Sequence, residues 1–282
     1  VQSQSETVWR QADTYKVPRI AFVNKMDRVG ASYERTIETM RRRLRANAIP
    51  VQLPLGEEDE FRGVIDLIGG RALVYQNNDG KVSLTPPEEM PVPEDEMSQY
   101  NEYRQAMIEK IVETDESLLI RYLEGEELSE DELRNALRKA TIDRLLVPVL
   151  CGTAIRGKGI HPLLDAIIQY LPSPVDVPAV EGTTPKSGET EYREPDKDGP
   201  LAALAFKVVS DPYVGRLVFL RVYSGTVNAG GLVNNLTKDK RERMGRLLRM
   251  HANHREELEF VQAGDICAAI GLKDTFTGDT IG

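Results

Sequence analysis

A polar tetrapeptide that directly follows a short apolar run could recognise a purine base. Residues 19–23, Arg-Ile-Ala-Phe-Val, are of the kind buried in a parallel sheet, and Asn-Lys-Met-Asp comes next. The Asp27 carboxylate can accept hydrogen bonds from N1–H and the 2-amino group of guanine, whereas adenine has an acceptor at N1 and no such amino group. Because an unpaired buried polar group costs about 1–3 kcal/mol, Asp27 alone could reject adenine. Asn24 would reach N7 or tie neighbouring loops together, and the aliphatic stem of Lys25 can lie over the base.

The stretch CGTAIRGKG, residues 151–159, offers a second candidate loop after another apolar run. Its pattern Gly-x-x-x-x-Gly-Lys resembles a phosphate-binding loop, but Gly159 stands where such a loop needs a hydroxyl for magnesium. It also lies far after the tetrapeptide, whereas a phosphate loop precedes the base-reading strand in GTPases of this type. We therefore interpret Thr153 and Ala154 as a loop that can direct a backbone N–H at guanine O6. By itself the tetrapeptide also fits a polar turn, and this second loop favours base recognition.

Composition indicates a globular protein with two or three compact domains. The chain has 282 residues, of which 40% are hydrophobic and 29% charged. No apolar run reaches the roughly 18 residues of a membrane helix, and the first residues lack the features of a signal peptide. Cys151 and Cys267 lie in different expected domains among apolar neighbours, which favours buried free thiols over a disulfide or metal pair. These features predict a cytoplasmic location.

The net charge of −9 is unevenly distributed. Residues 50–148 contain 10 Lys and Arg against 23 Asp and Glu, so this block carries −13 and the rest of the chain +4. Such an acidic block is a solvated surface or a site for a basic partner.

The order of expected elements predicts an interrupted α/β domain. Helices at 4–16 and 33–44, the second with Ser32 as N-cap, flank the first apolar strand. The acidic block has another character, and its expected elements are strands at 63–68 and 72–76, an Asn-Asn-Asp-Gly turn at 77–80, a Pro- and Glu-rich loop at 85–96, and two or more helices within 95–146. A strand at 145–150 and a helix at 162–171 then resume the α/β pattern. The block is therefore predicted to be an inserted α+β subdomain.

A second domain is expected after a linker. Residues 173–200 are rich in Pro, Gly, Thr and charge, as in a linker. Apolar alternation with period two then marks strands at 201–209, 217–223 and 266–270. The predicted fold class is thus an α/β domain with an inserted subdomain, followed by an antiparallel β-barrel.

The sequence resembles the bacterial elongation factor G family of translational GTPases over essentially its whole length. IAFVNKMDRVGA is similar to that family's guanine-specificity strand and loop, and CGTAIRGKGIHPLLDAIIQYLPSPVDVP to its second base-contacting loop with the following helix and linker. DPYVGRLVFLRVYSGTV, ERMGRLLRMHANHREELE and GDICAAIGLKDTFTGDT resemble its second domain. Thr153 departs from the usual Ser, but both residues carry a hydroxyl.

The resemblance implies roles for particular segments and residues. Residues 1–50 and 145–172 would be the C-terminal part of a GTP-binding domain with a partial P-loop GTPase-type sheet, 51–144 the G′ insert, 173–200 the linker and 201–282 domain II. Asn24, Lys25 and Asp27 would select guanine, Met26 would pack between them, and the Ala154 N–H would bind O6.

The resemblance also implies that this chain is an internal fragment. The family's P-loop, magnesium-binding Thr and water-orienting His precede the stretch with which the chain begins. We therefore expect no catalytic or metal-binding residue here, and neither GTP hydrolysis nor tight binding by the chain alone. GTP or GDP, with Mg²⁺, would bind the full-length parent.

Partners are implied by the same resemblance. The parent would drive movement of tRNA and mRNA on the ribosome, with a possible part in ribosome recycling, and would act as a monomer. The acidic insert would bind the ribosomal stalk protein, and a basic edge of domain II would contact ribosomal RNA. That edge comprises Lys238, Lys240, Arg241, Arg243, Arg246, Arg249, His251, His254 and Arg255. The alternatives are a ribosomal protection protein, a release-factor GTPase, or a non-catalytic docking module; for the basic residues, the alternative is a charged edge strand that resists aggregation.

Overall fold

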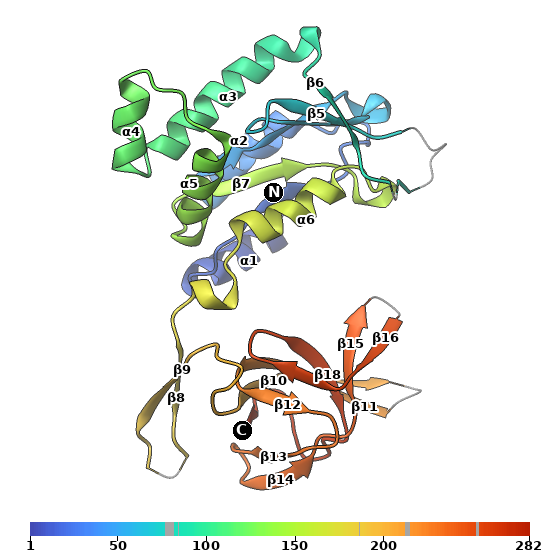
Figure 1. Cartoon of the computed structure of the whole chain (residues 1–282). Coiled ribbons are helices and arrows are strands. Elements are labelled where there is room, and N and C mark those ends of the chain that lie inside the picture. Colours follow the sequence, from blue (N-terminus) through green and yellow to red (C-terminus); the bar gives the residue numbers. More distant parts are fainter. Residues whose placement is uncertain (77–81, 84, 186, 212–214, 252–253) are drawn as a thin grey trace. The chain divides into compact units, whose positions relative to one another are not determined.

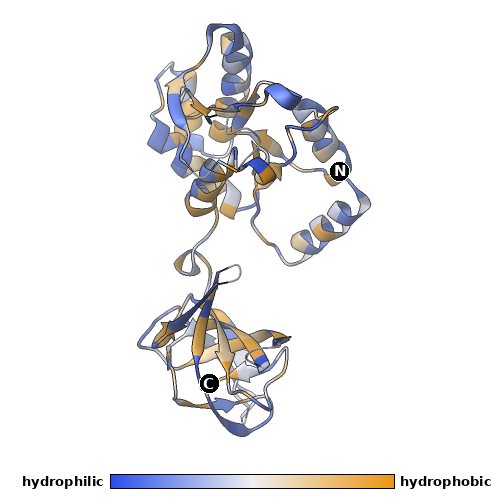
Figure 2. Cartoon of the chain, turned by 90° about the vertical axis from the view of Figure 1, so that its right-hand side faces the viewer, coloured by the Kyte–Doolittle hydropathy of each residue, from blue (hydrophilic) through white to orange (hydrophobic). Residues whose placement is uncertain are grey.

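The computed structural model describes residues 1–76, 82–83, 85–185, 187–211, 215–251 and 254–282. The chain divides into two compact units, residues 1–172 and 173–282. Each unit has its own hydrophobic core. In Figure 2 the hydrophobic colour concentrates on the strands of both units, while the outer surfaces of several helices are hydrophilic. The turn expected at 77–80 lies outside the described residues.

The first unit is built around a three-stranded parallel sheet with the order β1-β7-β2. The strands are β1 (Ala21–Val23), β2 (Ala48–Pro50) and β7 (Val147–Cys151), and every residue of β7 is buried. Its helices are α1 (Ser3–Thr14), α2 (Tyr33–Leu44) and α6 (Ile160–Tyr170) (Figure 1). The Ser32 hydroxyl accepts a hydrogen bond from the Arg35 N–H, which confirms the predicted N-cap of α2.

Residues 51–144, here called the intervening segment, separate β2 from β7. They form a four-stranded antiparallel sheet in the order β3-β4-β5-β6 and three helices. The elements are β3 (Gln52–Leu55), β4 (Gly63–Asp66), β5 (Arg71–Val74), β6 (Glu88–Pro91), α3 (Met97–Val112), α4 (Glu116–Leu123) and α5 (Glu130–Ile142). The helices confirm the helical prediction for 95–146.

Strand β6 shows that the prediction of a loop over 85–96 is wrong in part. β6 pairs with β5 through its backbone, but all four of its residues are exposed. It therefore has no apolar alternation from which a strand could be recognised. Strands β2 and β3 were also not predicted, because Pro50 and Pro54 interrupt the run that they share.

The second unit is dominated by an eight-stranded antiparallel sheet in the order β14-β13-β19-β10-β11-β18-β15-β16, with β12 and β17 as a separate pair (Figure 1). The strands are β10 (Ala202–Asp211), β11 (Gly215–Ser224), β12 (Thr226–Asn228), β13 (Leu232–Asn235), β14 (Lys240–Arg243), β15 (Leu247–His251), β16 (His254–Leu258), β17 (Phe260–Gln262), β18 (Ile266–Ile270) and β19 (Thr280–Ile281). The predicted antiparallel β domain is confirmed, while closure into a barrel stays a prediction.

The segment predicted to be a linker contains a hairpin. Strands β8 (Val180–Thr183) and β9 (Thr190–Arg193) pair antiparallel to each other. Seven of their eight residues are exposed, so neither strand has the apolar face that would reveal it in the sequence.

Both cysteines are buried free thiols, as predicted. Burial raises the pKa of Cys151, and burial, with a smaller effect of Asp265, raises the pKa of Cys267 to about 12. Within the described part of the chain, no helix combines the length and apolar character needed to cross a membrane.

Candidate functional site

Two loops leave the same edge of the parallel sheet. Residues 24–30, the first loop, follow β1, and residues 152–159, the second loop, follow β7. Because β1 and β7 are parallel neighbours, with Val23 opposite Cys151, both loops lie at their carboxyl ends, where open α/β sheets bind ligands. The Met26 N–H donates to the Gly152 carbonyl over 3.1 Å, and the Gly152 N–H donates to that of Val23 over 3.0 Å. The structure thus brings the two predicted loops together.

Gly152 permits this close approach. A Cβ at this position would lie 2.7 Å from Cζ of Phe22 and 2.5 Å from the carbonyl oxygen of Lys158. Any side chain would therefore force β1 and the second loop apart.

Asn24 connects the loops through its side chain. Its Oδ1 accepts hydrogen bonds from the N–H of Lys25 over 2.8 Å and from the N–H of Ala154 over 3.0 Å. Of the two roles expected for Asn24, the structure therefore shows the one that ties the loops together. The exposed Lys25 has a φ of 68°, a left-handed conformation uncommon for a residue with a side chain.

Asp27 presents a carboxylate that lacks hydrogen bonds. Its side chain is 17% exposed, and Oδ2 lies 3.7 Å from Nε of Arg156, too far for a hydrogen bond. Oδ1 is shielded from solvent and has no hydrogen-bond partner. A carboxylate in this condition gains most from a ligand that brings two donors, and the N1–H and 2-amino group of guanine are such a pair.

Met26 and Thr153 lie beneath the site. Met26 is buried in the core of the first unit, so it anchors the first loop. Thr153 is buried, with its N–H bonded to the Lys158 carbonyl and its Oγ1 without a partner. Ala154 is exposed.

The second loop does not direct its lysine to a phosphate. Lys158 Nζ donates to the Phe61 carbonyl over 2.9 Å, and burial together with the nearby Arg156 lowers the pKa of Lys158. Gly157 and Gly159 have φ values of 74° and 83°, which form the turn that leads into α6. This geometry agrees with the interpretation that residues 152–159 are not a phosphate cradle.

The predicted basic edge of the second unit is extensively neutralised. Arg249 and Glu256 are cross-strand neighbours in the β15–β16 hairpin and lie 3.1 Å apart. The other ion pairs of this edge are Lys238–Asp279, Lys240–Asp274, Arg246–Glu257 and Arg255–Asp211. The cluster is therefore less positive than its Lys and Arg content suggests.

Together, the parallel sheet with its two loops and the antiparallel second unit define a GTP-binding protein of the translational GTPase class. Residues 1–173 match the family model described as the elongation factor Tu GTP binding domain, and residues 215–282 match elongation factor Tu domain 2. The chain belongs to the elongation factor Tu GTP-binding domain family.

A solved structure is similar over the whole chain. A crystal structure of a protein from Thermus thermophilus is 32% identical in sequence, with a TM-score of 0.79. The alignment covers 100% of this chain and 38% of that protein, so the chain spans less than half the length of this relative.

Proposed function

We propose that residues 24–27 and 153–154 bind the guanine base of GTP and GDP in a translational GTPase of the elongation factor G type. The observation that carries the proposal is the unpaired Asp27 carboxylate at an edge where Asn24 joins two loops. The parent would couple GTP hydrolysis to movement of tRNA and mRNA on the ribosome. The family match supports guanine nucleotide binding, and the long stretches similar to elongation factor G support the narrower assignment.

Each residue has a defined task in the proposed complex. Asp27 accepts from N1–H and the 2-amino group, and Arg156 moves aside to admit them, since its guanidinium makes no hydrogen bond to Asp27 at 3.7 Å. The Ala154 N–H is shared between Asn24 Oδ1 and O6 of the base. The Lys25 stem covers the base plane.

Phosphate and magnesium chemistry are proposed for the parent as a whole. No Gly-Lys pair in this sequence is followed by Ser or Thr, as a phosphate-binding loop requires. We expect the 282-residue chain alone to bind GDP weakly and not to hydrolyse GTP.

The parent is also proposed to work as a cytoplasmic monomer on the ribosome. The intervening segment would bind the stalk protein, because it holds most of the acidic block. The second unit would contact ribosomal RNA through residues of the basic edge such as Arg241, which is exposed.

Asp27→Asn in the full-length protein tests the base assignment. Asn presents an N–H₂ donor that matches the 2-carbonyl of xanthine, so affinity should shift from guanine to xanthine nucleotides by about 100-fold or more. The measurement is competition between GDP and XDP for a fluorescent nucleotide, with the exposed Asp59→Asn as matched control. An Asp27→Asn protein that still prefers GDP would refute the role of Asp27.

A further inference from the structure

A single turn of the intervening segment contacts both loops of the proposed base site. Residues 56–61, here called the clamp turn, connect β3 to β4. The carboxylate Oε1 of Glu58 accepts from the N–H of Gly30 in the first loop over 2.7 Å. The carbonyl of Phe61 accepts from Lys158 Nζ in the second loop over 2.9 Å. The two loops are thus bridged from outside the parallel sheet.

A second part of the intervening segment supports the second loop. The Ser83 N–H donates to the Arg156 carbonyl over 2.8 Å. A Cβ on Gly157 would collide with the Ser83 carbonyl oxygen, so the two backbones are in direct contact. Arg156 is also the residue whose side chain approaches Asp27.

The clamp turn has a constrained backbone. Glu58 has a φ of 48°, which is unusual for a residue with a side chain, and Gly56 has a φ of 84°. A Cβ on Gly56 would clash with the Glu60 carbonyl, so only glycine fits there. Phe61 ends the turn as a fully buried side chain of the core. Such conformations persist only where the surrounding structure fixes them, and they concentrate at functional positions.

We propose that the clamp turn sets the spacing of the two base-binding loops, with Glu58 and Lys158 as positioning residues. This inference rests on the proposed guanine site. Because both loops are held by one turn of the intervening segment, any movement of that segment shifts both sides of the base together. The intervening segment thereby controls how long a guanine nucleotide stays bound.

Nucleotide dissociation from the full-length protein tests the clamp. Glu58→Met and Lys158→Met keep side-chain length and remove one hydrogen bond each, so each should release a fluorescent GDP analogue about tenfold faster in stopped-flow experiments. Lys158→Arg retains a donor and should stay within about threefold of the parent. Glu60→Met, an exposed position on the same turn, is the matched control and should stay within about twofold.

Further readouts separate positioning from general stability. The KM for GTP should rise in both variants while kcat is retained, because hydrolysis chemistry is untouched. Release rates of Glu58→Met and Lys158→Met equal to that of Glu60→Met would overturn the clamp. If one variant fails to fold, the other decides by itself. The base site has its own control: if Asp27→Asn still shows no shift to XDP in the same assay, the proposed function fails, and the clamp fails with it.

Discussion

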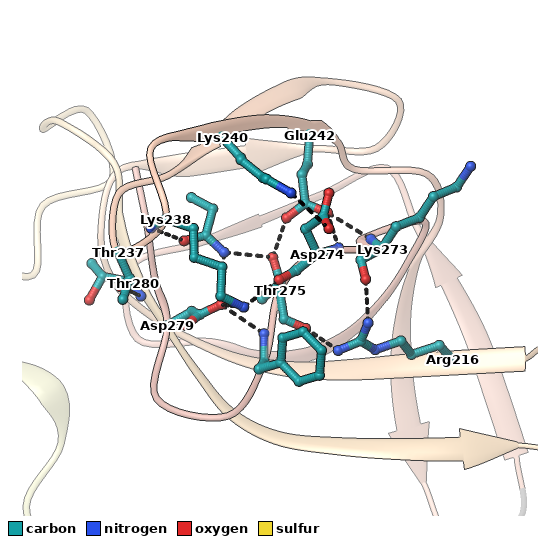
Figure 3. A network of polar contacts seen from close by, with 12 residues as sticks. Arg216, Thr237, Lys238, Lys240, Glu242, Lys273, Asp274, Thr275, Asp279 and Thr280 are labelled. Carbon is teal, nitrogen blue, oxygen red and sulfur yellow. Dashed lines mark hydrogen bonds and ion pairs between the residues drawn. The ribbon is translucent and has the colours of Figure 1, made fainter.

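Buried carboxylates in the two units have opposite surroundings. In the first unit, Asp27 has one oxygen without any hydrogen-bond partner and the other only in a long ion pair. In the second unit, Glu242 and Asp279 are buried within a connected network of donors (Figure 3). Among the described residues, every buried side-chain atom found without a partner belongs to the first unit.

The network of the second unit fixes the loop between β18 and β19. Glu242 accepts from the N–H groups of Lys273 and Asp274 over 2.7 and 2.8 Å and from the Thr275 hydroxyl. Asp279 accepts from the Phe276 N–H and the Asn235 amide, both over 2.8 Å, and pairs with Lys238. Arg216 donates to the carbonyls of Lys273 and Thr275 and lies over the Phe276 ring, as its labelled side chain in Figure 3 illustrates.

The difference distinguishes a structural carboxylate from one available for binding. A buried acceptor whose donors are all supplied by the protein contributes to stability, and its loss leaves those donors unpaired. An acceptor without donors costs free energy in the absence of a ligand, and this cost is recovered only on binding.

The largest effect in this comparison is expected from Glu242→Ala. The substitution leaves three donors without their acceptor, so the second unit should lose about 3 kcal/mol of stability. Hydrogen exchange of the amides of residues 273–276 measures the loss. Glu256→Ala is the control, since Glu256 is 62% exposed in its pair with Arg249, and it should cost less than about 0.5 kcal/mol. Equal protection in both variants would show that the network is not structural.

Acid should produce a smaller effect on the same unit. Burial alone would raise the pKa of Asp279, but hydrogen bonds from Lys238, Phe276 and Asn235 outweigh it and lower the pKa. A lowered folded pKa means that this stabilisation is complete above the unfolded value of about 4 and is lost as the pH falls through the folded value. Urea unfolding followed by circular dichroism should show a declining midpoint below about pH 4. Asp279→Asn should flatten this dependence, and an unchanged slope would remove Asp279 as its cause.

The smallest effect on stability is expected from Asp27→Ala. The variant loses only a long, partly exposed ion pair and removes an unpaired buried oxygen, so unfolding of the first unit should change by less than about 0.5 kcal/mol. Trp9, the one tryptophan in the sequence, reports this unit by fluorescence. Guanine nucleotide affinity of the full-length variant should nevertheless be largely lost. A destabilisation as large as that of Glu242→Ala would end the distinction between the two carboxylates.

Much of the fold could be predicted because it depends on local patterns. Ser32 marks the start of α2 by its own hydrogen bond, and β10, β11 and β18 carry apolar residues that lead into one core. Strand β6 could not be predicted, because its exposed residues are held by backbone pairing with β5 alone. Local chemistry predicts an element only where its side chains, and not its neighbours, determine it.

The site divides in the same way. The two loops could be predicted because each follows a buried strand, and parallel pairing brings their ends together. The contacts of Glu58 and Lys158 could not, because they depend on where the clamp turn lies in three dimensions. The neutralised basic edge was missed for a related reason. The register of β15 and β16 sets Arg249 beside Glu256, and the count of charges along the chain does not contain that register.

The two buried thiols make the protein suitable for site-specific labelling. Thiolate is the species that reacts with maleimide dyes, and burial suppresses it at Cys151 and Cys267 by raising their pKa values. A cysteine introduced at the exposed position of Glu60 would therefore be the dominant reactive thiol without removal of either native one. A dye there, paired with a fluorescent nucleotide as energy-transfer partner, would follow the clamp turn in real time.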